Sequence, residues 1–110
     1  MAYDEELAER IGNVLEGEPG LTEKHMFGGC AFLLDGNMAV SASGQGGMLL
    51  RVPPADTSSL VSEPGATRFR MRGRELDGWL AIDSAAVETD ENLRRWVSLG
   101  VLYARSLPPK

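Results

Sequence analysis

The chain has 110 residues and a net charge of −5, with 43% hydrophobic and 25% charged residues. This length suits one hydrophobic core, and this composition is that of a folded domain and not of a disordered chain. The excess of acids argues against a generic nucleic-acid binder, because such binding depends on cationic groups that displace counterions from phosphates. We therefore expect a single domain over residues 1–110.

The cysteine content and the N-terminus indicate a cytoplasmic protein. Cys30 is the only cysteine, so no internal disulfide can form, and the first six residues are acidic where a signal peptide is basic and then apolar. No apolar run approaches the roughly 20 residues that are needed to cross a bilayer. We expect no membrane-spanning segment.

The acidity is concentrated in the first segment of the chain. Residues 1–23 hold seven of the 16 acids and one of the 11 bases. Asp4 is a typical helix N-cap, and apolar residues follow it at helical spacing as far as Gly17. The pattern predicts an amphipathic helix over about residues 4–16.

Short apolar stretches in the next part of the chain are typical of strands. Asp35-Gly36-Asn37 is a turn signal of the kind that closes hairpins. Gly28-Gly29 interrupts the stretch before this turn, and we interpret this pair as a bulge or a place of close approach. The strands that we expect here cover about residues 22–34, 38–43 and 48–52.

The second half of the chain contains weaker helix and strand signals followed by a strong helix. Residues 54–62 predict one or two helical turns, and residues 67–72 alternate as a strand does. Asp77-Gly78 predicts a turn before a last strand over residues 79–82. Thr89 is a plausible cap for a final helix that ends near Arg105 and packs Trp96 onto the sheet.

These elements together predict an α+β fold. Strands clustered between two terminal helices favour an antiparallel sheet covered by helices over a succession of βαβ units. We expect two layers, with a sheet of about five strands covered by N- and C-terminal helices in the order α-β-β-β-α-β-β-α. Trp79 and Trp96 are most simply core residues.

The stretch Met26-Phe27-Gly28-Gly29, with an apolar strand after it and then Asp35-Gly36, resembles the signature of the TfoX/Sxy N-terminal domain family. The resemblance continues along nearly the whole chain, over about residues 5–107. Three later parts resemble the family's next strand, its second hairpin and the tryptophan of its last helix: Leu49 to Val52, Gly73 to Trp79, and Trp96.

The resemblance implies a fold, a kind of activity and a kind of partner. The fold is a two-layer structure with an antiparallel sheet. The family is named for bacterial regulators of competence gene transcription, which are thought to act with the cyclic-AMP receptor protein and not as enzymes. Those regulators carry a second, C-terminal helical domain, so we expect here a stand-alone N-terminal domain. The resemblance also includes Met38 of the hairpin, but an aromatic residue often found after this methionine is replaced by Ala39-Val40.

His25 and Cys30 are the only residues of the usual thiol-catalysis and zinc-ligand types. Their separation of five places them on opposite faces of a regular strand, although a Gly28-Gly29 bulge would reverse that parity. A structural zinc site needs about four ligands. We expect a packed thiol and a strand-end histidine, and we expect no catalytic residue, no metal and no cofactor.

Three other patterns have simple structural interpretations. The glycine-rich residues 43–47 precede a strand, whereas a phosphate-binding loop feeds a helix, so a hairpin connection is favoured. The carboxylate pairs are explained by turns and by a helix start; these pairs are Asp77 with Asp83, and Asp90 with Glu91. Phe27 and Phe32 with the two glycines mark either a recognition edge for a peptide strand or a core with an unusual backbone.

Arg68, Arg70 and Arg72 lie at a spacing of two, which places them on one face of a strand, and Arg74 extends the series. Arginine binds carboxylates and phosphates in bidentate fashion, so this cationic stripe suits an acidic protein surface or a nucleic acid. The alternative is a solvated strand face, or an edge protected by charge against aggregation.

Three hypotheses of function follow from the sequence. The first is a non-enzymatic regulatory or adaptor domain that binds a protein partner through Arg68, Arg70, Arg72 and Arg74, with a homodimer as one form of such binding. The second is a nucleic-acid-binding accessory domain that uses the same arginines. The third is a thiol or redox function of Cys30.

Overall fold

The structure of the protein, a computed structural model, describes residues 3–26 and 28–110. One antiparallel sheet contains the six strands of these residues in the order β1-β2-β3-β4-β6-β5. The strands are β1 (Leu21–Met26), β2 (Gly29–Leu34), β3 (Asn37–Ala42), β4 (Met48–Arg51), β5 (Ala66–Met71) and β6 (Arg74–Ile82). The helices are α1 (Glu5–Leu15), α2 (Thr57–Leu60) and α3 (Asp90–Ser106), with 3₁₀ turns at Pro54–Asp56 and Ser84–Val87.

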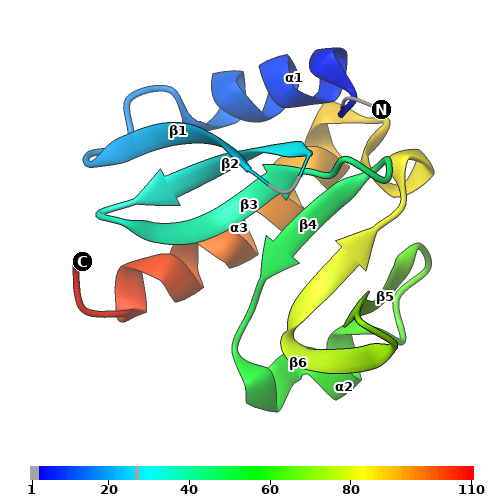
Figure 1. Cartoon of the computed structure of the whole chain (residues 1–110). Helices are drawn as coiled ribbons and strands as arrows, with labels where there is room; N and C mark the ends of the chain where they lie inside the picture. The colour runs from blue at the N-terminus through cyan, green and yellow to red at the C-terminus, as the bar shows by residue number, and fades with distance from the viewer. Residues whose placement is uncertain (1–2, 27) are drawn as a thin grey trace.

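The two long helices pack on one face of the sheet (Figure 1). Their apolar side chains form a single core with side chains of the central strands. Its largest fully buried members include Trp96 and Ile11 from the helices and Leu50 and Leu80 from the strands. The predicted two-layer α+β fold, with helices at both ends of the chain flanking the strands, is confirmed.

Both predicted helix starts are confirmed by their caps. The Asp4 carboxylate accepts a hydrogen bond of 3.1 Å from the backbone N–H of Leu7, and the Thr89 hydroxyl accepts one of 3.1 Å from that of Asn92. These bonds satisfy backbone donors that the first turn of a helix leaves unpaired. No helix in the described part of the chain combines the length and the apolar character needed to cross a membrane.

The prediction of one strand over residues 22–34 is wrong, and the sheet has six strands where about five were expected. β1 and β2 pair with each other as a hairpin, with Met26 opposite Gly29. Gly28 has a φ of 74°, in the left-handed region that glycine adopts without steric cost, so the pair of glycines allows a reversal of the chain and not a bulge. A bulge does occur further on, where Ala39 is the extra residue between β2 and β3.

The predicted turn at Asp77-Gly78 is also wrong. β6 runs without a break from Arg74, and the turn lies at Arg72-Gly73, where both residues have a positive φ as in a type I′ hairpin. Arg68 of β5 pairs with Leu80 of β6, but the next residue, Phe69, pairs with Leu76. Residues 77–79 of β6 therefore form a bulge. The bulge is fixed by the backbone N–H of Gly78, which donates to the buried Thr57 hydroxyl at 2.7 Å.

The predicted turn at Asp35-Gly36 is confirmed, and it holds the end of the chain. The Lys110 backbone N–H donates to the Asp35 carbonyl at 2.8 Å. The buried Asn37 side chain donates to the Pro108 carbonyl at 2.9 Å. These bonds place residues 107–110 against the β2–β3 hairpin.

Two glycines inside helices should respond in opposite ways to alanine. A Cβ at Gly12 would lie 3.7 Å from the Phe32 ring, an ordinary contact, whereas a Cβ at Gly100 would lie 2.5 Å from the Ala39 carbonyl oxygen. We expect Gly12→Ala to raise the free energy of unfolding by about 0.5–1 kcal/mol and Gly100→Ala to lower it by about 1–3 kcal/mol. Urea denaturation followed by tryptophan fluorescence measures both, and destabilisation by Gly12→Ala would contradict the packing described for α1.

Candidate functional site

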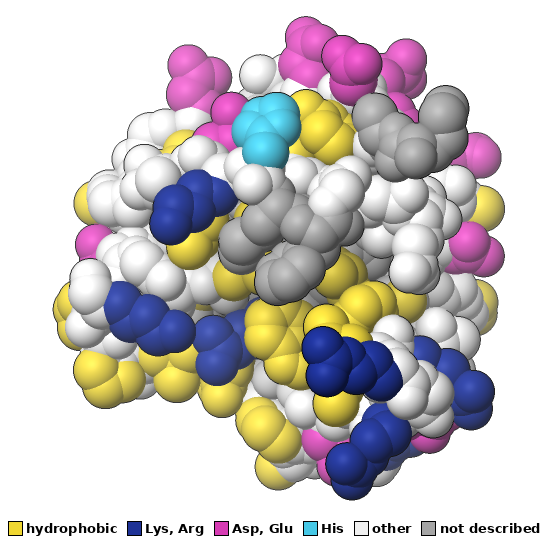
Figure 2. All heavy atoms as spheres, viewed as in Figure 1, with side chains coloured by type: hydrophobic (Ala, Val, Ile, Leu, Met, Phe, Trp, Pro, Cys, Tyr) yellow, Lys and Arg dark blue, Asp and Glu magenta, His cyan; other side chains and the backbone are white. Residues whose placement is uncertain are grey.

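The face of the sheet opposite α1 and α3 carries a groove of about 480 Å³. Six of the side chains that line it are large and apolar: Met38, Leu49, Phe69, Met71, Leu76 and Trp79. In Figure 2, hydrophobic side chains gather over the middle of this face, and Lys and Arg side chains lie around them. The only charged side chains lining the groove, among the described residues, are those of Arg70 and Arg72.

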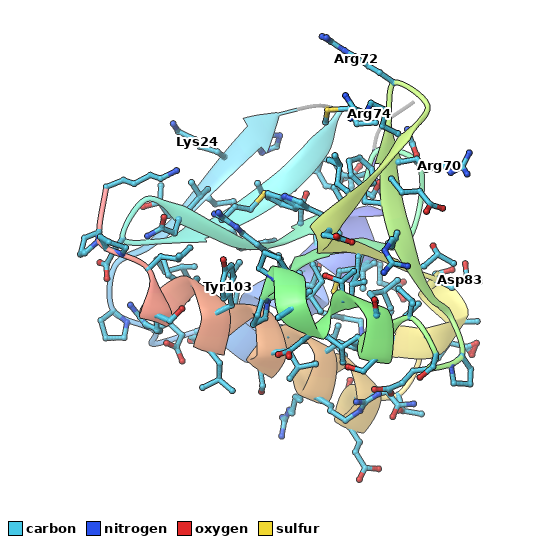
Figure 3. The ribbon with its side chains drawn as sticks, turned by 90° about the horizontal axis from the view of Figure 1, so that it is seen from below. Lys24, Arg70, Arg72, Arg74, Asp83 and Tyr103 are labelled. Carbon is cyan, nitrogen blue, oxygen red and sulfur yellow. The ribbon has the colours of Figure 1, made fainter. Side chains whose placement is uncertain are left out.

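The alternation of strands explains why this face is apolar. In β4, Met48 and Leu50 are buried in the core below the helices, so Leu49 points to the opposite face. β4 is therefore apolar on both faces, although only one of them is covered by a helix. The two ends of the sheet, β1–β2 and the β5–β6 hairpin, rise on the side away from α3, so the uncovered face is concave (Figure 3).

Trp79 was expected in the core, and this expectation is wrong. The side chain is only partly buried and lines the groove. The Arg51 guanidinium lies 5.3 Å from the centre of the Trp79 ring and 5.6 Å from that of Tyr103, so it joins the sheet to α3 by two cation–π contacts. Trp96, the other tryptophan, is in the core as predicted, with 2% of its surface exposed.

The four arginines lie on the β5–β6 hairpin and not along one regular strand. Arg68 and Arg70 belong to β5, whereas Arg72 is in the turn and Arg74 begins β6. The expected series is cut short by the end of β5 at Met71, and the bulge of β6 opposite Arg68 and Phe69 shifts the pairing of the two strands. The hairpin brings Arg70 and Arg72 to the groove beside Phe69 and Met71, whose side chains would lie on the opposite face of a regular strand.

Two of the four arginines are paired with acids and two are not. The Arg68 Nε lies 3.0 Å from the Asp77 carboxylate, and the Arg68 guanidinium also donates to the Ser58 hydroxyl at 2.7 Å. Arg70 lies 3.5 Å from the Glu75 carboxylate. Within the described residues, no carboxylate lies within ion-pair distance of Arg72 or Arg74. The tip of the hairpin therefore presents two cations to solvent.

The charges of the molecule are segregated between its parts. Lys24 of β1 lies on the same side of the sheet as Arg72 and Arg74 (Figure 3). The acids of α1 form a separate edge, seen at the top of Figure 2. The concave face is thus locally cationic in a protein whose net charge is −5.

The sequence argument about His25 and Cys30 is corrected by the β1–β2 hairpin. The two residues are directly opposite each other in the register of β1 and β2, so they share a face of the sheet. Cys30 is nevertheless buried, with 2% of its surface exposed, as expected for a packed thiol. Burial first, and then the hydrogen bond and charge of Glu23, raise the pKa of the Cys30 thiol to about 11.

A thiol with this pKa should react slowly in the folded protein. At pH 8 it is protonated, and the thiolate is the species that iodoacetamide attacks. We expect alkylation of Cys30 in the native protein to be at least about 100-fold slower than in the protein unfolded in guanidinium. Mass spectrometry of timed samples measures both rates, and equal rates would restore the hypothesis of a reactive thiol.

The remaining motifs have structural roles, although Asp77 lies within β6 and not in the predicted turn. The glycine-rich residues 43–47 join β3 to β4, with the Ser43 N–H donating to the Gly47 carbonyl. Asp77 pairs with Arg68, and Asp90 starts α3 and pairs with Arg10. In the part of the chain that the structure describes, no group of three or more His, Cys, Asp or Glu side chains is arranged to hold a metal ion.

In the Met26-Phe27-Gly28-Gly29 motif, Met26 and Gly29 pair in the β1–β2 hairpin described above, and Phe27 lies outside the described residues. The hypothesis of a recognition edge with Phe32 loses one of its members, because Phe32 is buried in the core with 2% of its surface exposed. The groove itself was missed. Its one sequence signal is β4, whose consecutive apolar residues Met48, Leu49 and Leu50 make both faces of a short strand hydrophobic.

The sheet with helices on one face and a groove on the other defines a small, two-layer α+β domain. The TfoX N-terminal domain family matches residues 13–104, most of the chain. The protein therefore belongs to the TfoX N-terminal domain family, which is a family of regulatory-type domains. No curated protein and no solved structure matches the chain.

The hairpin arginines should contribute little to stability. Arg72 and Arg74 are exposed and form no ion pair with the residues that the structure describes, so reversing both to Glu should change the free energy of unfolding by less than about 0.5 kcal/mol. Arg105 is the contrast, because it binds Glu18 at 2.8 Å, Asp35 at 3.2 Å and the Pro19 carbonyl at 2.7 Å. We expect Arg105→Ala to lower the free energy of unfolding, measured by urea denaturation, by about 1 kcal/mol. A larger loss from the Arg72 and Arg74 reversal than from Arg105→Ala would contradict this division.

Proposed function

We propose that this protein is a non-enzymatic regulatory or adaptor domain that acts by binding a protein partner on its concave sheet face. The observation that carries the proposal is the apolar groove of about 480 Å³ with Arg70 and Arg72 in its lining. A contiguous apolar surface rimmed by charged groups is characteristic of an interaction site in a folded domain. The surface lies on a rigid sheet, whose geometry is set by the buried core on its other side.

Membership of the TfoX N-terminal domain family supports the regulatory part of this proposal. The family's competence regulators are associated with a transcription regulator as partner, and a protein–protein contact of that kind needs an exposed recognition surface. A role in transcription or competence regulation through such a partner is the finer form of the proposal.

A second candidate function is nucleic-acid binding through the same arginines. It is favoured by Arg72, Arg74 and Lys24 lying on one side of the sheet, away from the acids of α1. Such binding would weaken steeply with salt, because each phosphate contact releases counterions. It would be seen as a gel shift of a DNA or RNA fragment at low salt.

Two exposed apolar residues on opposite sides of the molecule offer a matched test of the docking face. Met71 lines the groove and is 44% exposed, and Leu102 of α3 is 69% exposed. A photoreactive amino acid placed at either position in the full chain, and irradiated in lysate of the native host, reports what lies against it. We expect a discrete protein adduct from position 71 and none of the same mass from position 102.

Charge reversal supplies the control for this capture. Arg72→Glu with Arg74→Glu, combined with the probe at position 71, should reduce the adduct at least about tenfold, because charges at the rim steer and orient the partner. Arg94→Glu, on the exposed side of α3, should leave the yield unchanged. The proposal fails if both probe positions give the same adducts or none, and an adduct that nuclease removes supports the second candidate instead.

A further inference from the structure

The groove combines two features that restrict what can occupy it. Its volume of about 480 Å³ lies within the range of roughly 300–1,000 Å³ over which protein pockets enclose compact ligands. Most of the groove surface formed by the described residues is apolar. The charged side chains that line it are those of two arginines, and no carboxylate of the described residues is among them. An occupant must therefore bring apolar groups for the floor and anionic groups for the rim.

We propose that the groove binds a short linear segment of a partner protein in which bulky apolar side chains are flanked by Asp or Glu. This inference rests on the proposed function and adds the chemistry of the partner's recognition element. The apolar side chains lie on Met38, Leu49 and Leu76, and the flanking carboxylates pair with the arginines of the β5–β6 hairpin.

Charge complementarity carries the proposal. Arg72 and Arg74 are exposed, and no acid among the described residues pairs with them. Arg70 is held only by a 3.5 Å contact with Glu75, and 68% of its side chain is exposed, so it is free to exchange that carboxylate for another. Arginine binds carboxylates in bidentate geometry, which favours acidic residues in the partner over neutral ones.

The apolar part of the groove suits side chains of more than one shape. Met38 and Met71 lie among its lining residues, and methionine is unbranched and polarizable, so it adapts to irregular partners. Met71 is 44% exposed, beside Arg70 and Arg72. An apolar side chain that covers Met71 is thus placed within reach of the arginines that would hold its acidic neighbours.

A second copy of this chain is a poorer occupant than another protein. Its α1 carries Glu5, Glu6 and other acids, whose negative charge is opposite to that of the hairpin arginines. The apolar residues of α1, however, are buried under its own sheet, and Leu7, Ile11 and Leu15 are each at most 3% exposed. Of the large apolar side chains of α1, only Val14 is partly exposed, so the acidic helix has too little apolar surface to fill the groove.

A nucleic acid is disfavoured by the state of the aromatic side chains. Single-stranded nucleic acids are commonly held by bases stacked on aromatic rings above a cationic groove. The Trp79 ring is already covered by the Arg51 guanidinium at 5.3 Å, which leaves Phe69 as the other aromatic ring in the described lining. The overall charge of −5 adds a general repulsion for phosphates.

The test uses synthetic peptides and the full chain. The probe is a short fluorescent peptide with Phe and Leu between Asp and Glu residues, and its binding is followed by fluorescence anisotropy. Two control peptides change one feature each, with Lys in place of the acids or Ser in place of Phe and Leu. We expect the acidic apolar peptide to bind at least about tenfold more tightly than either control, the equivalent of about 1.4 kcal/mol.

Variants of the protein locate the binding. Arg72→Glu with Arg74→Glu should lower the affinity for the acidic peptide at least about tenfold and reduce the salt dependence of binding. Arg94→Glu should change neither quantity. Met71→Gln changes an exposed position where folding is not at risk. It should lower the affinity for the peptide severalfold without altering the salt dependence of binding. Circular dichroism confirms that each variant is folded.

Several results would overturn the inference. These are equal binding of the acidic and Lys-containing peptides, tighter binding of an oligodeoxythymidine or of oleate, self-association that blocks the peptide, and no binding at millimolar peptide.

The photo-capture experiment separates a failure of this inference from a failure of the proposed function. If position 71 captures a protein whose cross-linked segment is neutral or basic, the proposed function stands and the inference of an acidic segment is wrong. If position 71 captures no protein, both are wrong.

Discussion

The packing of α1 and α3 on the same face of the sheet is the constraint on which the rest of the molecule depends. Ile11 and Trp96 meet Leu50 and Leu80 there, and these side chains are almost completely removed from water. Gly100 lets α3 approach the backbone of β3 closely. Because both long helices pack on this side, no helix of the described residues covers the other side of the sheet, and its apolar side chains line a groove.

The irregularities of the strands shape that uncovered face. The bulge in β6 is held by Gly78, whose N–H binds the Thr57 hydroxyl and whose carbonyl accepts from the Val52 N–H at 2.9 Å. A bulge bends its strand and increases the local twist, and the β5–β6 hairpin rises here on the side of the sheet away from α3 (Figure 3). The same bend brings Phe69, Arg70 and Met71 to one groove, so a feature of the backbone decides which side chains lie together.

The structural role of the family motif lies in its two glycines. Its glycines reverse the chain between β1 and β2, and its Cys30 neighbour is buried with a pKa raised to about 11. The Asp35-Gly36 turn has a similar structural role, because Asp35 binds both Arg105 and the backbone of Lys110. The motif glycines and the Asp35-Gly36 turn therefore stabilise the frame, and the groove lined by Arg70 and Arg72 lies on the other side of the sheet from the helices.

Local patterns in the sequence determined the helices, their caps at Asp4 and Thr89, the Asp35-Gly36 turn, the two-layer α+β class and the family, because each depends on residues close together in the chain. Only the tertiary structure decided whether Gly28-Gly29 and Asp77-Gly78 form a turn or a bulge, since the same glycine conformations serve both. It also decided the groove. Met38, Leu49 and Leu76 come from three strands, and no local pattern reports which sheet face the helices leave uncovered.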